Sequence, residues 1–428
     1  ISECLVGSEM CIRDSFHIDM PEAVRNIIHT IEEHGFKAYA VGGCIRDSIL
    51  GRNPDDWDIT TSAVPSQIKT FFKRTVDTGI AHGTVTIMID KTGYEVTTYR
   101  IDGEYEDGRH PKSVEFSDRL VDDLCRRDFT INAMAYNDTD GFVDEFKGLD
   151  DLDTKIIRCV GEPELRFTED ALRMMRAIRF SAQLGFTIDE ATWNAIKKLS
   201  PSISKISMER VHVELGKTLM SAHPDYVAQY SEAGLFAPIL PVIDNALKSR
   251  YKRKILATLQ HTPDNIYLRY AALFITSTPD EAAKTLRALK LDNKTVNTVS
   301  KLVELSKMDI EETEPAVRTA LNKYGRDFLP LWHELMMAVI QASEDITGIS
   351  NPAKVKHLLT LKRLGTDILA RGDCFTIKDL DISGNDLIEY GLQGHEIGET
   401  LKSLLDIVIE NPKLNDKATL IAMIEHIK

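Results

Sequence analysis

The chain has 428 residues, more than a single hydrophobic core usually supports, so two to four packed units are expected. Apolar residues make up 43% and charged residues 28%, as in ordinary globular proteins, and the absence of any run of about 18 apolar residues excludes a membrane-spanning helix. The formal net charge of −14 argues against a nucleic-acid-binding surface over the whole body, but a local basic stripe can lie on an acidic protein.

The cysteines and the first residues indicate where the protein works. The six cysteines are scattered without a CxxC pair, at Cys4, Cys11, Cys44, Cys125, Cys159 and Cys374. This pattern argues against a structural zinc site and indicates a reducing compartment, the cytoplasm. Residues 1–16 are neither basic nor apolar enough for a secretory signal, and we expect a leader or a disordered tail without a function there.

The first part of the chain predicts mixed secondary structure. A helix over residues 22–34 would place Val24, Ile27, Ile28 and Ile31 on one face. Alternating segments on both sides of Lys91-Thr92-Gly93 are typical of a hairpin. The expected strands are 37–41, 84–90, 94–100 and 156–160. Together these elements predict one α+β unit up to about residue 160.

After Gly161-Glu162-Pro163 the periodicity becomes almost wholly helical. Thr168 is the expected N-cap of a helix that runs to about Leu184 and ends at Gly185. Further helices are expected near residues 189–199, 207–221, 251–260, 279–289, 295–307 and 398–409. The sequence therefore predicts an α+β head followed by a long helical body.

Two polar segments near the start of the chain suggest nucleotide chemistry. Gly42 and Gly43 follow a strand and precede a helix, where bare backbone amides can bind phosphate, although such a pair is often only a turn. Asp56 and Asp58 are spaced to project from one face of a strand and could hold a hard divalent cation, or could be solvated loop carboxylates. Glu95, on the second hairpin strand, is either a third metal carboxylate or an exposed strand residue.

Arginines recur in two later segments. Arg126 and Arg127 begin the segment RRDFTINA, which is either a surface ion pair or a clamp for a triphosphate, because guanidinium groups bind phosphate in a bidentate manner. In EDALRMMRAIRF, Asp170 and Arg173 are three residues apart and could act together as acceptor and donor toward the edge of a base. Ordinary helix-dipole stabilisation is the alternative for the acidic residues.

Two other polar segments have weaker signals. The stretch Arg100–Pro111 is long and glycine-bearing, and it is either a plain surface loop or a segment that gates the metal site. A basic run could touch phosphates, although such runs are usually solvated; its members are Lys248, Arg250, Lys252, Arg253 and Lys254.

The order and spacing of these motifs resemble the class II CCA-adding enzymes, the tRNA nucleotidyltransferases of the polymerase-β superfamily. The resemblance rests on GGCIRDSILGRNPDDWDITTSA, RIDGEYEDGRHP, RRDFTINAMAY, EDALRMMRAIRFSAQLGF and ISKISMERVHVEL, with support from DLDISGNDLIEYGLQGHEIG near the end. It implies an α+β fold: a polymerase-β-like nucleotidyltransferase head with a small mixed sheet, followed by an elongated all-α neck, body and tail. The implied domains are 17–160 (head), 161–222 (neck), 223–310 (body) and 311–428 (tail, contacting tRNA).

The resemblance also implies roles for individual residues. Asp56 and Asp58 would be the Mg²⁺ ligands, with Glu95 as the third catalytic carboxylate. Asp170 and Arg173 would pair with the base edge of CTP or ATP. The whole nucleotide-binding set implied in this way is Gly42, Gly43, Arg46, Asp47, Arg127, Asp128, Asn132, Asp170, Arg173, Arg176 and Arg179.

The implied activity is template-independent addition of the 3′-terminal CCA to immature or damaged tRNA from CTP and ATP, with Mg²⁺ as cofactor and pyrophosphate as product. An A-adding tRNA nucleotidyltransferase and a bacterial poly(A) polymerase are the alternatives. Ala171 after Glu169-Asp170 favours the CCA-adding enzymes, and the Arg100–Pro111 loop favours an enzyme that finishes with A. A non-catalytic RNA-binding protein and a small-molecule nucleotidyltransferase are less favoured, because the carboxylates, the arginines and the neck helix are all present.

Overall fold

The computed structural model describes residues 17–103 and 113–427. The expected leader (1–16) and most of the expected gating loop (104–112) lie outside the described residues. The chain divides into two compact units, the first ending at Ile239 and the second beginning at Leu240. This division into two units does not test the limits of the four domains expected from the resemblance, which remain predictions.

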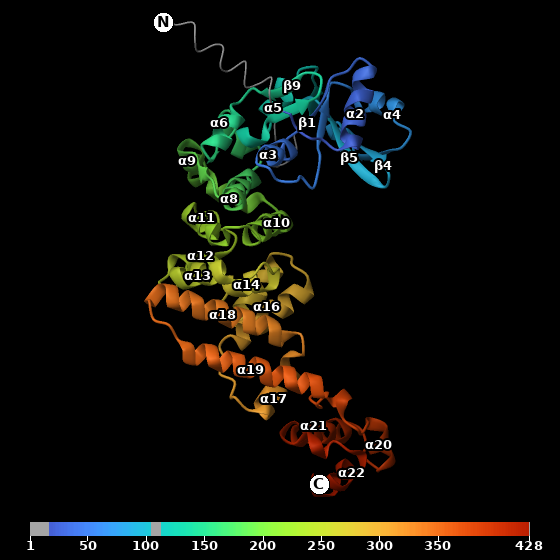
Figure 1. The fold of residues 1–428 in the computed structure, drawn as a ribbon, viewed down its shortest axis with the longest axis vertical. Helices are drawn as coiled ribbons and strands as arrows, with labels where there is room; N and C mark the ends of the chain where they lie inside the picture. The colour runs from blue at the N-terminus through green and yellow to red at the C-terminus, as the bar shows by residue number, and fades with distance from the viewer. Residues whose placement is uncertain (1–16, 104–112, 428) are drawn as a thin grey trace. The chain divides into compact units, whose positions relative to one another are not determined.

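The first unit contains a seven-stranded mixed sheet in the order β3-β4-β5-β2-β1-β8-β9 (Figure 1). β2 and β5 pair in parallel, and all other neighbours are antiparallel. The strands are β1 (Ala38–Val41), β2 (Ile59–Thr61), β3 (Thr75–Gly79), β4 (Thr84–Ile89), β5 (Thr92–Thr98), β8 (Met134–Asn137) and β9 (Gly141–Asp144). The small mixed sheet expected in the head is confirmed.

Two expected strands differ in their limits. The β4–β5 hairpin is present, but β5 begins at Thr92 because Asp90 and Lys91 take positive φ values of 47° and 71° and form the turn themselves. Only Ile156–Ile157 of the strand expected at 156–160 forms a strand, β10, which pairs in parallel with β11 (Thr187–Ile188). A third small sheet joins β6 (Arg100–Asp102) to β7 (Val114–Phe116).

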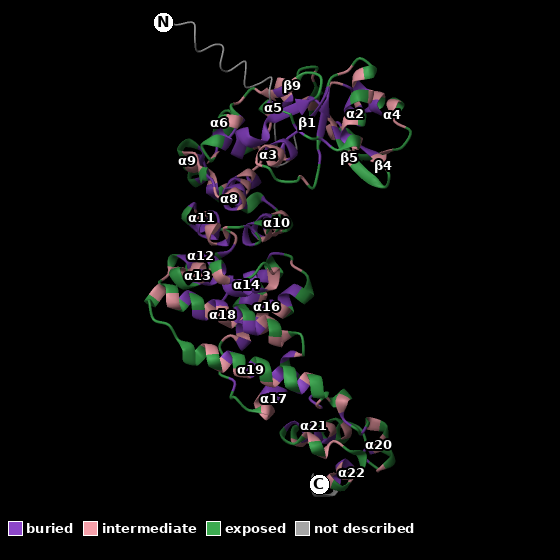
Figure 2. Cartoon of the chain, viewed as in Figure 1, coloured by how far each residue is buried: buried purple, intermediate pink, exposed green. Residues whose placement is uncertain are grey.

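Helices cover the sheet and continue beyond it. They are α2 (Glu22–Glu33), α3 (Gly43–Ile49), α4 (Pro65–Phe71), α5 (Leu120–Cys125), α6 (Gly148–Asp153), α7 (Pro163–Glu169), α8 (Leu172–Leu184), α9 (Glu190–Leu199), α10 (Met208–Leu219) and α11 (Val227–Glu232). The expected apolar face of α2 is confirmed, since Val24, Ile27, Ile28 and Ile31 are all buried. Figure 2 shows that β1, inside the sheet, is buried. Gly185 ends α8 with a φ of 71°, as expected for a left-handed C-cap.

The helix expected to begin after Thr168 is in fact two helices. α7 starts at Pro163, which lacks the N–H that a first-turn position does not need, and Thr168 lies inside it. Asp170 then takes an extended conformation (φ −142°, ψ 105°), and its carboxylate accepts a hydrogen bond from the Leu172 N–H at 3.0 Å. The expectation of Thr168 as N-cap was wrong: Ala171 is the N-cap of α8, and the Asp170 side chain just before it binds the N–H of the first residue of the helix.

Arg158 connects the sheet-bearing part of the first unit to its later helices. Its guanidinium bonds Asp151 of α6 at 3.1 Å and Asp189, the N-cap of α9, at 2.6 Å. Asp189 also accepts a hydrogen bond from Thr192. The α+β part and the following helices are therefore joined directly by buried and half-buried polar contacts, and not only by the chain that connects them.

The second unit is helical throughout its described residues. Its helices are α12 (Pro241–Lys248), α13 (Lys252–His261), α14 (Ile266–Leu273), α15 (Pro279–Ala288), α16 (Asn293–Leu305), α17 (Glu314–Tyr324), α18 (Phe328–Thr347), α19 (Pro352–Arg371), α20 (Gly384–Glu389), α21 (His395–Glu410) and α22 (Lys417–Ile427). α13, α15, α16 and α21 coincide with expected helices. Among the residues described, no helix is both long enough and apolar enough to cross a membrane.

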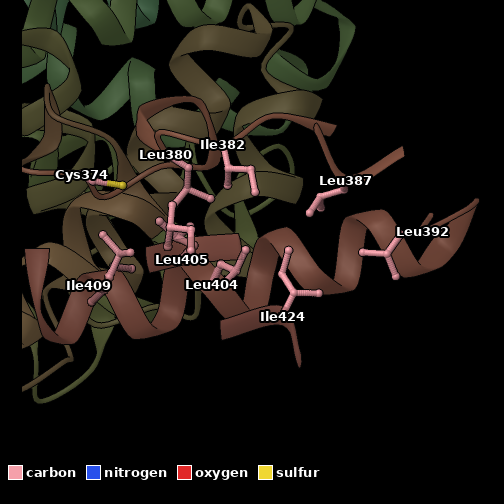
Figure 3. Packing of buried hydrophobic residues seen from close by; sticks show 11 residues of the cluster. Cys374, Leu380, Ile382, Leu387, Leu392, Leu404, Leu405, Ile409 and Ile424 are labelled. Atoms are coloured by element: carbon pink, nitrogen blue, oxygen red, sulfur yellow. The ribbon is translucent and has the colours of Figure 1, made fainter. Parts of the chain in front are cut away.

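The end of the second unit has its own apolar core. Leu387, Leu404, Val408 and Leu420 are fully buried, and their neighbours complete a cluster drawn from α20, α21, α22 and the segment before them (Figure 3). The buried Arg318 of α17 fixes this core, because its guanidinium donates to the Ile409 carbonyl at 2.7 Å and to Asp373 at 2.8 Å. Its side chain is only 2% exposed.

Candidate active site

A glycine turn brings three functional groups together in the first unit. Gly42 caps α3 with a φ of +90°, a conformation that residues with side chains rarely adopt. A Cβ atom added to Gly42 would lie 3.0 Å from Arg127 Nη1 and 3.9 Å from Asp58 Oδ2. A side chain at position 42 would therefore displace the Arg127 guanidinium, whereas Asp58 would remain at ordinary contact distance.

The carboxylates expected to bind metal lie beside this turn. Asp56 and Asp58 are exposed in the segment that enters β2, and Glu95 is exposed on the parallel neighbour β5. Although the Asp58 side chain is exposed to solvent on one side, the protein atoms around its carboxylate partly desolvate it and raise its pKa; the charges of Asp56 and Glu95 raise it further, and Arg127 opposes them. The negative charges of the three carboxylates therefore interact, and a bound cation would reduce the repulsion between them.

A dedicated metal cage is absent from the described residues, since no group of three or more His, Cys, Asp or Glu side chains is placed to hold an ion. Mg²⁺ commonly binds one or two carboxylates and completes its coordination with substrate phosphates and water. The pair Asp56 and Asp58 fits that pattern, because oxygen donors are the only ligands it offers. Glu95 lies close enough to influence Asp58 but is not assembled with the pair into a three-ligand site.

A buried carboxylate, that of Asp123, orients the Arg127 side chain. Asp123 of α5 has no exposed side-chain surface and bonds Arg126 at 2.6 Å and Arg127 at 3.1 Å. Burial alone would raise the pKa of Asp123, but the two guanidinium groups outweigh it and lower the pKa. The arrangement is thus more than a surface ion pair, because it directs Arg127 toward Gly42 and Asp58.

A chain of hydrogen bonds crosses from α3 to α8. Arg46 donates to Asn132 at 2.6 Å, Asn132 donates to Asp128 at 3.1 Å, and Arg176 donates to the other Asp128 oxygen at 2.7 Å. Asp47 also holds the Arg46 guanidinium at 2.7 and 2.9 Å. Burial would raise the pKa of Asp128, but Arg176 and Asn132 lower it well below its usual range. Five residues of the expected nucleotide-binding set are therefore joined in one network.

Asp170 and Arg173 do not bond each other through their side chains. Asp170 is held by Arg210 of α10, at 2.7 and 3.3 Å. Arg173 bonds Glu169 at 2.5 Å and donates to the backbone carbonyls of Arg126 and Arg166. The expected pair is close in the chain, but each member has its own partner, and sequence reasoning missed Arg210 because it lies 40 residues away from Asp170.

Three arginines surround the ring of Phe180. The guanidinium carbons of Arg46, Arg176 and Arg179 lie 5.0, 5.3 and 3.8 Å from the ring centroid. Arg179 is buried and bonds Glu214 of α10 at 2.5 Å, so its charge is balanced. Of the three arginines that follow one another at intervals of three residues on this helix, Arg179 faces inward, whereas Arg173 and Arg176 stay partly exposed.

Three family models match this architecture in chain order. The poly A polymerase head domain matches residues 38–158, the probable RNA- and SrmB-binding site of polymerase A matches residues 185–247, and tRNA nucleotidyltransferase domain 2 matches residues 267–424. The CCA-adding enzyme of Limosilactobacillus fermentum is 37% identical over 407 residues, which cover 94% of this chain and 95% of the relative. The chain belongs to the CCA-adding enzymes.

Solved CCA-adding enzymes share the fold. The Bacillus stearothermophilus CCA-adding enzyme, in complex with CTP, matches with a TM-score of 0.73 and 31% identity over 95% of this chain and 96% of that one. The Thermotoga maritima CCA-adding enzyme, complexed with tRNA, matches with a TM-score of 0.60 and 20% identity over 98% of each chain, which supports the fold alone.

Membership in the CCA-adding enzymes confirms the recognition made from the motifs, and it makes the chain a tRNA nucleotidyltransferase. It favours CCA addition over the A-adding and poly(A) polymerase alternatives. It also implies use of a divalent metal ion, in keeping with the carboxylate pair beside Gly42.

Proposed function

We propose that this chain adds the 3′-terminal CCA to tRNA in the cytoplasm, one nucleotide at a time and without a nucleic-acid template, using CTP, ATP and Mg²⁺. The single observation that carries the proposal is that both Arg127 and Asp58 lie against the Gly42 turn, 3.0 Å and 3.9 Å from the position that a Cβ atom would take there. That arrangement combines metal ligands, a phosphate-binding cation and open backbone in one place. Pyrophosphate is the second product.

Asp56 and Asp58 hold the metal in this proposal. Bound Mg²⁺ would lower the pKa of the terminal 3′-hydroxyl of the RNA and offset the charge on the phosphates. Glu95 adds negative charge near Asp58 and supports cation binding from the neighbouring strand. Because Asp58 is exposed, it can reach a metal without unfolding any packed element.

The incoming nucleotide lies against the arginine network. Arg127 binds its phosphates, and Gly42 and Gly43 let the backbone approach them. Arg46, Asp47, Asp128, Asn132 and Arg176 form the wall between the phosphates and α8. Most hydrogen-bond donors of these side chains already have partners. The side chains are therefore held in place before the nucleotide binds, and binding needs to order them little.

Asp170 and Arg173 select the base. The Asp170 carboxylate accepts a hydrogen bond from the base edge, and the Arg173 guanidinium donates one, which together suit cytosine and adenine better than uracil and guanine. Arg210 and Glu169 hold these two side chains in place before the base arrives. The base therefore shares the Asp170 oxygens with Arg210.

The decisive experiment uses tRNA lacking CCA, CA or A, with CTP and ATP supplied singly or together. Wild-type enzyme should extend all three substrates to CCA and stop. Asp58→Ala should abolish incorporation while the melting temperature stays within a few degrees of wild type. The control is Asp55→Ala, which changes a neighbouring exposed residue and should remain active.

Extension only of tRNA lacking A would indicate an A-adding enzyme, and unlimited A addition would indicate a poly(A) polymerase. Retained turnover by Asp58→Ala in Mg²⁺ would refute the assigned metal site.

A further inference from the structure

A basic pocket lies in the first unit, next to Arg46 and Arg179. It has a volume of about 480 Å³ and is formed by residues of α3 and α8 and by the end of α10. Its charged lining consists of Arg46, Asp47, Arg52, Arg179 and Lys217. The pocket therefore presents four cationic side chains and one carboxylate.

The charge of this pocket is opposite to that of the whole chain, which is −14. Arg46 and Arg179 are buried and already paired with Asp47 and Glu214. Arg52 and Lys217 are exposed, and no acidic side chain among the described residues forms an ion pair with either. Two uncompensated cations beside two buried guanidinium groups make a local site for an anion, and phosphate oxygens suit both kinds of donor.

The position of the pocket fits a strand that leaves the catalytic centre. Gly42, beside Asp58, stands at the start of α3, and Arg52 follows the end of this helix. Seven helical residues span about 10 Å, because an α-helix rises 1.5 Å per residue. A stacked nucleic-acid strand advances about 3.4 Å per nucleotide. The pocket is therefore about two or three nucleotides away from the reacting end.

We propose that this pocket binds a backbone phosphate of the RNA substrate, two or three nucleotides upstream of its 3′ end, through Arg52 and Lys217. The inference rests on the proposed function and adds a contact to the same reaction. Such a contact carries no base information, so it positions the RNA end equally well for each of the successive additions. Arg46 and Arg179 form the floor of the pocket and remain tied to Asp47 and Glu214.

The triphosphate of the incoming nucleotide is the other source of phosphate, and the structure favours the RNA. The nucleotide phosphates are expected at the Arg127 side of Gly42, at the opposite end of α3. The pocket is also open where Arg52 and Lys217 lie, as a continuous strand requires, and Met220 at its rim is 39% exposed.

The test compares Lys217→Ala, Arg52→Ala and the double variant with Lys205→Ala, an exposed lysine in η3 (Ser200–Lys205) outside the pocket. Binding of tRNA lacking CCA is measured over a range of KCl concentrations. Each pocket substitution should raise the Kd for tRNA roughly three- to tenfold and lower the slope of log K against log salt by about 0.7. Lys205→Ala should change neither, and Lys217→Arg should restore binding.

Neutral methylphosphonate linkages, placed one at a time at the last four positions of the RNA, locate the phosphate. Wild-type enzyme should lose affinity for the RNA most when the second or third linkage is neutral. Lys217→Ala should lose no further affinity at that linkage, because the lysine that binds the phosphate is already absent. A substitution that raises the KM for CTP and leaves tRNA binding unchanged would assign the pocket to the triphosphate and overturn the proposal. Unchanged binding of both substrates would also overturn it.

The two proposals fail in different ways. Wild-type enzyme that adds no nucleotide to tRNA refutes the proposed function. Normal wild-type addition, together with pocket variants that bind tRNA as wild type does at every salt concentration, refutes only the phosphate site.

Discussion

Arg210 donates to both carboxylate oxygens of Asp170, at 2.7 Å and 3.3 Å, across the break between α7 and α8. Asp170 lies outside both helices, and the other hydrogen bond that its carboxylate accepts comes from the Leu172 N–H. The residue assigned to base selection is thus fixed by a helix that begins 38 residues later in the chain, at Met208.

Substitution of Asp170 is expected to damage base selection more than metal use. Asp170→Ala should reduce discrimination of CTP and ATP against UTP and GTP by at least tenfold, since one buried-edge hydrogen bond provides about 1–3 kcal/mol of selectivity. Arg210→Ala should weaken discrimination less, because Asp170 keeps its helix-cap bond. Misincorporation assays on tRNA lacking CCA and on tRNA lacking A measure discrimination by both variants, and the double variant should resemble Asp170→Ala. Strictly additive effects would contradict a shared role.

Gly42→Ala should reduce activity far more than stability. The added methyl group would lie 3.0 Å from Arg127 Nη1, so it displaces a phosphate ligand as well as straining a φ of +90°. Gly51→Ala is the matched control, with a φ of +69° and no atom within 4 Å of its added methyl group. Both variants should lose about 1–2 kcal/mol of stability. Only Gly42→Ala should lose tenfold or more in kcat/KM, and equal losses would refute the role of the close approach.

The ion pair between the buried Asp128 and the partly exposed Arg176 should make stability depend on pH in the acid range. The pKa of Asp128 is lowered in the folded protein, so its stabilising contribution is complete above the ordinary value of about 3.9 and is lost as the pH falls below it. Asp128→Asn should therefore destabilise the first unit by about 2–4 kcal/mol at pH 7. Urea unfolding at pH 7, 5 and 3 should show this difference shrinking at pH 3. A difference that stays constant would be inconsistent with the pair.

Removal of Arg318 should destabilise the second unit. Arg318→Ala leaves Asp373 and the Ile409 carbonyl without their buried donor, which costs about 3–5 kcal/mol. Arg371 pairs with the same Asp373 but is 46% exposed, so Arg371→Ala should cost less than about 1 kcal/mol. Fluorescence of Trp332, the only tryptophan of the second unit, follows the transition when the other two are replaced by Phe. Similar losses in both variants would be the contrary result.

Features with local signals were predictable from the sequence. The apolar face of α2, the β4–β5 hairpin and the left-handed C-cap at Gly185 all follow from neighbouring residues. The start of α8 was not, because Thr168 is a good capping residue but lies inside α7, and the N-cap of α8 is Ala171, which has no capping side chain. α18 was also missed; its Pro330 resembles a helix breaker but lies in the first turn, where no N–H is needed.

The site was predictable as a set of residues but not as a set of contacts. The glycine pair, Asp58 and Arg127 were recognised from motifs, and the structure brings them together. The side chains that orient them, Asp123 and Arg210 among them, had no signal of their own. Arg210 becomes a positioning residue through Asp170, 40 residues away in the sequence, and Asp123 does so because the fold buries it against Arg126 and Arg127.

The ties made by Arg158 have a consequence for swapping parts between related proteins. A junction placed near residue 160 would cut its bond to Asp189, separate Asp128 from Arg176 and take the Arg126 carbonyl away from Arg173. In a chimera joined there, one parent protein would supply one half of this hydrogen-bond network and the other parent the other half. Hybrids that keep the first unit whole as far as Ile239 preserve every one of these bonds and should be the ones that express.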